Sequence, residues 1–200
     1  MTAARRITPF DDAEARLAAG VQGMRWFLVS LAVLFGSVLI GYLSLRMLVV
    51  SGRPQLPPLP RGLWVSTLLL VASSGTLIAA VRAARRGDAD GLARYLAATV
   101  LLGLAFLAVQ TGCWIAWIGP MRDAVGQAER RFLLTGFYVL TGMHALHVIG
   151  GLVPLAVITR RARAGRYTRD FHPGVIYTAM YWHFLGVIWI VLYATLLLAT

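Results

Sequence analysis

The sequence has no lysine, a single cysteine and only eight acidic residues, and these shortages limit the classes of protein to which it can belong. Cys113 alone cannot form an internal disulfide, so the cysteine content leaves the redox compartment open. All eight carboxylates lie outside the long apolar runs. A proton or cation transporter usually needs a carboxylate at membrane depth, and their absence there argues against a small transporter.

The sequence is rich in apolar residues. Hydrophobic residues make up 58% of the 200 positions and charged residues 14%, which is more apolar surface than one soluble domain of this length could bury. The net charge of +11 comes entirely from arginine and could suggest a nucleic-acid partner. The arginines, however, cluster beside apolar runs and not along a soluble face. The composition therefore predicts a membrane protein with no nucleic-acid partner.

Five apolar runs are long enough to cross the roughly 30 Å hydrocarbon core, and loops rich in arginine, proline or glycine separate them. Residues 1–25 are polar and lack the pattern of a secretory signal peptide, so we expect a cytoplasmic tail there. The prediction is an all-α transmembrane domain over residues 26–200, with spans at about 26–50, 63–81, 95–118, 132–158 and 175–199.

The loop arginines predict an orientation, because short loops rich in arginine stay in the cytoplasm. The segment before the first span and the loops after the second and fourth spans hold 13 arginines, and the opposite side holds 6. We therefore expect the N-terminus inside and the C-terminus outside.

The run from Phe137 to Leu152, FYVLTGMHALHVIGGL, carries two histidines three positions apart. Residues at this spacing are neighbours on one helix face, so His144 and His147 form a polar stripe on an apolar helix. Gly150 and Gly151 remove side-chain bulk beside them and let another helix approach closely. This helix is expected at the centre of the bundle.

A metal or haem site is the more specific functional interpretation of the intramembrane histidines, since imidazole binds haem iron, copper and zinc. His144 and His147 are less than one turn apart, whereas two stacked haems need histidines well separated along their helices. A zinc or copper site would need a third ligand, and only His183 is available because Cys113 lies toward the opposite membrane face. Packing or lipid contact is the interpretation that we favour.

The run FYVLTGMHALHVIGGL is followed by YWHFLGVIWIVLY at 181–193, and it is preceded by STLLLVASSGT at 66–76 and LLGLAFLAVQ at 101–110. In this order the motifs resemble subunit III of the haem-copper cytochrome c and quinol oxidases, where the two upstream motifs correspond to the second and third helices. A five-helix chain corresponds to the short bacterial form of the family.

Four positions depart from the family, which usually carries a carboxylate at each. They read Leu31, Cys113, Ile176 and Gly186 here, and all four are neutral. These departures suit a divergent branch, such as the subunit III homologue accessory to nitric oxide reductases, and they leave open whether the chain affects proton uptake.

The resemblance implies a non-catalytic subunit of a proton-translocating terminal oxidase, in the bacterial plasma membrane and in aerobic respiratory electron transport. It implies no cofactor in this chain, haem-copper subunits I and II as partners, and lipid in an inter-helix cleft. A membrane haem-binding protein is the less favoured alternative. The residues that we single out are His144, His147, Trp182 and His183 for lipid or inter-helix contact, and Gly142, Gly150 and Gly151 for close helix packing.

Overall fold

The computed structural model describes residues 13–49, 59–123, 128–169 and 172–199, and this part of the chain is all-α. Each of its helices is long and apolar enough to cross a membrane. The predicted five-helix transmembrane bundle is therefore confirmed, while the side of the membrane that holds each terminus stays a prediction. The helices are α1 (Ala13–Val49), α2 (Gly62–Arg86), α3 (Ala89–Asp123), α4 (Ala128–Arg163) and α5 (Pro173–Ala199).

The helices are longer than the apolar runs from which they were predicted. The 36 residues of α4 extend over about 54 Å at 1.5 Å per residue, well beyond the roughly 30 Å hydrocarbon core. Similarly, α1 begins at Ala13, within the segment 1–25 that we assign to a tail. Hydropathy marks only the part of a helix that needs apolar surroundings, whereas backbone hydrogen bonds continue the helix into the headgroup region. The sequence therefore predicts spans better than helix ends.

A tight turn joins α2 to α3. Gly87 adopts a left-handed conformation with φ of 74°, which glycine reaches without steric cost. The Gly87 and Asp88 N–H groups donate to the carbonyls of Ala84 and Ala83, each at 3.0 Å, and so satisfy the last carbonyls of α2. The Asp88 carboxylate then accepts from the N–H of Gly91 at 2.8 Å and caps the start of α3. The turn sets α2 and α3 side by side and antiparallel.

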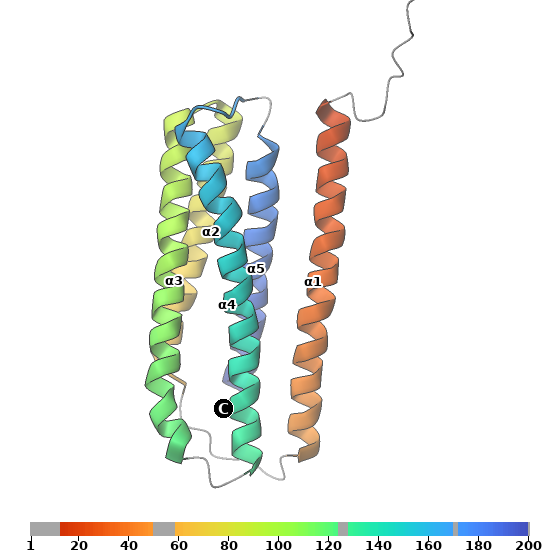
Figure 1. Cartoon of the computed structure of the whole chain (residues 1–200), viewed down its shortest axis with the longest axis vertical. Coiled ribbons are helices and arrows are strands. Elements are labelled where there is room, and N and C mark those ends of the chain that lie inside the picture. Colours follow the sequence, from red (N-terminus) through yellow and green to blue (C-terminus); the bar gives the residue numbers. More distant parts are fainter. Residues whose placement is uncertain (1–12, 50–58, 124–127, 170–171, 200) are drawn as a thin grey trace, which may run out of the picture.

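The helices form a four-helix bundle with a fifth helix beside it (Figure 1). Consecutive helices from α2 to α5 contact one another, and α5 closes the bundle against α2. Among the described residues, α1 contacts α4 and α5 but neither α2 nor α3. The first helix is therefore attached along one side only.

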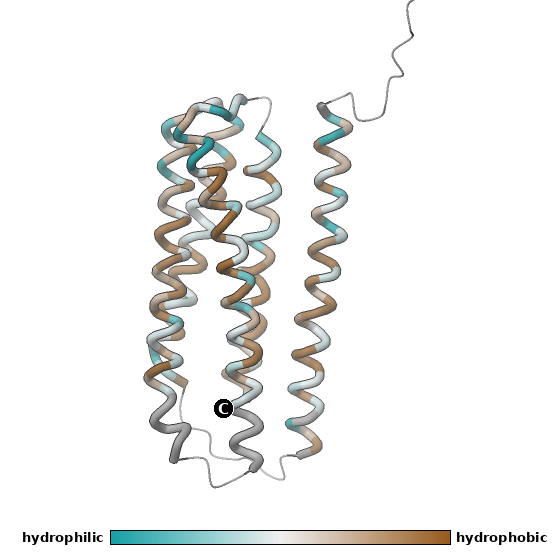
Figure 2. The backbone as a smooth tube through the Cα atoms, viewed as in Figure 1, coloured by the Kyte–Doolittle hydropathy of each residue, from teal (hydrophilic) through white to brown (hydrophobic). Residues whose placement is uncertain are grey.

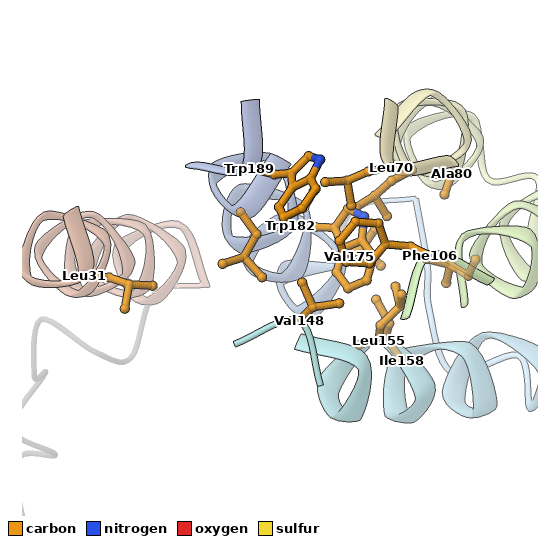
Figure 3. Close-up of a cluster of buried hydrophobic side chains, with 14 of the residues drawn as sticks. Leu31, Leu70, Ala80, Phe106, Val148, Leu155, Ile158, Val175, Trp182 and Trp189 are labelled. Carbon is orange, nitrogen blue, oxygen red and sulfur yellow. The ribbon is translucent and has the colours of Figure 1, made fainter. Parts of the chain in front are cut away.

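Large aromatic side chains fill the centre of the bundle (Figure 3). Trp182, Trp189 and Phe106 are each at most 1% exposed. The two indole N–H groups point from α5 to α2, where Trp182 donates to the Ser73 hydroxyl at 2.9 Å and Trp189 to the Thr67 hydroxyl at 3.0 Å. Each indole gains the polar partner that it needs inside an apolar core, and each bond ties α5 to α2.

The exterior is as apolar as the core. Trp26, Leu68 and Leu146 are each more than 60% exposed, which water would disfavour and hydrocarbon chains accept. Apolar residues cover the middle of the helices, and hydrophilic residues gather near the upper end in the view of Figure 2. At that end lie the start of α1 and the loops α2–α3 and α4–α5, where most of the described arginines occur (Figure 1).

Candidate functional site

His144 lies inside the bundle, fully buried among aromatic rings from three other helices. Its ring centroid is 5.1 Å from that of Trp189 on α5, 5.9 Å from Phe106 on α3 and 6.4 Å from Phe35 on α1. Neither ring nitrogen has a hydrogen-bond partner in the described part of the chain. Such surroundings favour a neutral imidazole that acts by packing, since a buried charge without a partner is costly.

His147 lies one turn further along α4, beside α1. Its ring centroid is 5.0 Å from that of Phe35, and its Nδ1–H donates to the backbone carbonyl of Met143 at 2.7 Å. The carbonyl can only accept, so this bond places the proton on Nδ1. The Tyr181 hydroxyl donates to the His147 carbonyl at 3.0 Å and links α4 to α5. The residue therefore sits where three helices meet.

Trp182 and His183 are adjacent in sequence but face different ways. Trp182 points into the core and bonds Ser73, whereas His183 lines a groove of about 250 Å³ on the outer surface between α2 and α5. The hydroxyl groups of Thr67 and Ser74 lie in the same groove. The structure therefore separates His183 from the pair on α4, which faces α1 and the core.

The three glycines of α4 that the sequence analysis singled out differ in their surroundings. A Cβ built on Gly151 would lie 2.8 Å from Cε1 of Tyr181, which is too close for any other residue without movement of that ring. A Cβ on Gly150 would lie 3.9 Å from the Tyr181 hydroxyl, and one on Gly142 would have no neighbour within 4 Å. Close approach of α5 to α4 therefore depends most on Gly151.

No metal site is apparent among the described residues, where no three histidine, cysteine or acidic side chains lie close enough to share an ion. Cys113 is buried at the far end of α3, with its Sγ near Gly62 on α2. The histidines of α4 are instead surrounded by aromatic rings.

A larger cleft lies between α1 and the pair α4 and α5, with a volume of about 570 Å³. Its walls are mainly apolar, and Arg161 from the last turn of α4 lies at one end. Sequence reasoning singles out only Gly150 among its lining residues, because most of the others look like ordinary apolar span positions and Arg161 counts there only as one of the loop arginines. The cleft is lined by Met24, Phe27, Gly150, Val153, Pro154, Val157, Ile158, Arg161, Gly174, Tyr177, Thr178 and Tyr181.

Comparison with known proteins matches residues 15–199 to the family described as cytochrome c oxidase subunit III. The chain belongs to that family. It is 33% identical to cytochrome c oxidase subunit 3 of Thermostichus vulcanus, over 90% of this chain and 87% of that protein. It is 34% identical to the subunit 3 of Synechocystis sp., over 86% of this chain and 72% of that protein. A probable cytochrome c oxidase subunit 3 of Mycobacterium tuberculosis is 31% identical over 85% of this chain and 83% of its own length.

Membership of the subunit III family confirms the resemblance carried by the α4 and α5 motifs. It supports a multi-pass membrane protein that works as a subunit of a haem-copper oxidase in the respiratory chain. The comparisons favour neither a nitric oxide reductase accessory subunit nor a separate haem-binding protein.

Proposed function

We propose that this subunit III packs on haem-copper subunit I, next to subunit II, in the bacterial plasma membrane, and that it carries no redox centre of its own. The observation that carries the proposal is the interior of the bundle. His144, the most buried histidine, is enclosed by the rings of Phe35, Phe106 and Trp189. In the part of the chain that the structure describes, no three histidine, cysteine or acidic side chains gather around it or elsewhere to share an ion. An interior of this kind stabilises a structure and offers no nucleophile with a base.

The cleft between α1, α4 and α5 is the place where we propose that lipid binds. Its apolar walls suit an acyl chain, and the Arg161 guanidinium at its end suits a phosphate group, which arginine binds through paired N–H donors. Since α1 touches the bundle along one side only, a lipid held here would fill space that side chains leave open. Lipid would thereby help to fix α1 against the bundle.

Purification of a tagged chain from its own membranes in mild detergent tests the partner assignment. We expect the catalytic subunit to co-purify, with all haem and copper assigned to it. Recovery of the chain as a lone, stable species with a Soret band would contradict the proposal and favour the haem-binding alternative.

The lipid assignment is tested on the same preparation by native mass spectrometry. Arg161→Gln should reduce the phospholipid retained per chain, because the headgroup loses its cation. Arg160→Gln is a matched control, since Arg160 is exposed on the same turn but does not line the cleft. Equal lipid retention in both variants would contradict a role of the cleft.

A further inference from the structure

The groove between α2 and α5 is a further hollow on the outer surface of the bundle, and it differs in its chemistry from the cleft where we propose that lipid binds. Its floor is formed by the buried Leu70 and Trp189, and its rim by Val71, Val187 and Ile190, which are each at least half exposed. Between floor and rim lie Thr67, Ser74 and His183. An otherwise apolar groove thus contains three polar side chains.

The polar groups of the groove lie deep in the membrane. Ser74 is the thirteenth of the 25 residues of α2, and His183 is the eleventh of the 27 residues of α5. At 1.5 Å per residue the antiparallel helices bring both to about 15–18 Å from the same end of the bundle. That depth is near the middle of a bilayer core roughly 30 Å thick, where water does not reach.

Thr67 is satisfied within the chain, but its two neighbours are not. The Thr67 hydroxyl donates to the Leu63 carbonyl and accepts from the Trp189 indole. The Ser74 hydroxyl and the His183 ring make no hydrogen bond to another of the described residues. Exposed hydroxyls elsewhere, such as Ser30 and Thr111, instead bond the carbonyl of their own helix. The groove therefore presents two free polar groups outward.

Acyl chains have neither donors nor acceptors, so lipid cannot satisfy these groups, whereas a polar side chain on another helix can. We propose that the groove between α2 and α5 is the docking surface for a membrane-spanning helix of the catalytic subunit. This inference rests on the proposed function. An uncharged polar side chain of that helix, an amide or a hydroxyl, hydrogen-bonds His183 and Ser74, and its apolar neighbours pack on Val71 and Val187. Intramembrane polar residues that face outward are expected at such contacts.

Site-specific photo-cross-linking in intact membranes tests the surface. A benzoylphenylalanine at Val187, on the rim, should cross-link the chain to the catalytic subunit. The same residue at Leu104, which is 50% exposed on α3, is the control and should give no such product. Cross-linking from Leu104 but not from Val187, in membranes where the complex is intact, would overturn the inference and leave the proposed function standing. Absence of any complex with the unmodified chain would overturn the proposed function itself.

Filling the groove gives a second test with an independent readout. Gly186 lines the groove, and its built Cβ makes only ordinary contact with the Ser74 hydroxyl, so Gly186→Leu adds bulk to the groove with little disturbance of the bundle. We expect loss of co-purification with the catalytic subunit. Gly112→Leu adds the same side chain to an open, exposed face of α3 and should leave co-purification unchanged. Retention of the complex by the Gly186 variant would contradict docking in this groove.

Discussion

At the scale of single residues, the interior depends on a few polar groups whose partners lie on other helices. Trp182 reaches Ser73 from α5, and the Ser73 hydroxyl itself donates to the Leu70 carbonyl at 2.7 Å. The serine thus accepts from one helix while it donates within another. His144, in contrast, is buried without a polar partner in the described part of the chain. The two residues should therefore respond differently to apolar replacement.

The bond between Trp182 and Ser73 can be measured by a double-mutant cycle. Trp182→Phe and Ser73→Ala should each destabilise the chain, with a coupling energy of about 0.6–1.7 kcal/mol, which extends from the average to the largest value found by double-mutant cycles between membrane helices. Unfolding in mixed detergent micelles provides the free energies. Trp189 bonds Thr67 instead, so the pair Trp189→Phe and Ser73→Ala should show a coupling near zero. Equal coupling in both pairs would contradict the assignment of the bonds.

Replacement of His144 by leucine should leave the free energy of unfolding unchanged or raise it. Leucine has nearly the volume of histidine, and two buried nitrogens without partners in the described part of the chain are removed, which is nearly neutral or favourable. His147→Leu is the comparison, because it loses the bond to the Met143 carbonyl and should cost about 0.5–1.5 kcal/mol. A larger loss of stability from His144→Leu than from His147→Leu would show that the His144 ring has a polar partner.

At the scale of the helices, glycine decides how closely neighbours approach, but only at some positions. On α3, a Cβ at Gly103 would lie 2.8 Å from Cη2 of Trp182 and 3.0 Å from Cδ2 of Leu152, whereas Gly112 has open space. Both glycines occupy the same helix and look alike in the sequence. Their different surroundings arise because α3 packs on α2 and α4, where the Trp182 side chain of α5 also reaches it, and turns its other face away from the bundle.

Gly103→Ala should therefore destabilise the bundle by about 1–3 kcal/mol, as expected for overpacking of a filled core. Gly112→Ala should be neutral or slightly stabilising, because alanine favours the helix and meets no neighbour. The thermal stability of the two variants in the same detergent checks the difference. Similar stabilities would indicate that the Trp182 ring moves aside without cost.

At the scale of the whole molecule, the arginine-rich loops and the start of α1 lie at one end of the bundle (Figure 1). Successive transmembrane helices run in opposite directions, so every second connection lies at the same end of the bundle. The arginines that we predict to be cytoplasmic therefore lie together. Orientation relative to the cell, however, depends on membrane insertion and not on the fold.

A reporter fused after Thr200 tests the orientation. If the arginine-rich end is cytoplasmic, the fifth helix ends outside, so alkaline phosphatase should be active and a cytoplasm-dependent fluorescent protein should not. The two reporters fused in the loop after α2, at Gly87, should give the reverse pattern. A cytoplasmic Thr200 would overturn the predicted orientation.

The sequence by itself determined the class, the number of spans and the family, because each depends on local composition or on ordered motifs. Helix ends were less predictable, as at Ala13, since helices continue past the apolar runs. The neighbourhood of His144 and His147 was expected from their spacing, but Phe35, Phe106 and Trp189 around them were not.

Only the tertiary structure decided which side of each helix faces inward. In a soluble protein, polarity distinguishes the surface from the core, but here hydrocarbon surrounds the bundle, and Leu68 outside is as apolar as Leu70 inside. For the same reason, the sequence alone does not reveal the cleft between α1, α4 and α5. Nor does it reveal that Trp182 points into the core while its neighbour His183 lines the groove. Where lipid and core have the same chemistry, the packing of the helices alone distinguishes them.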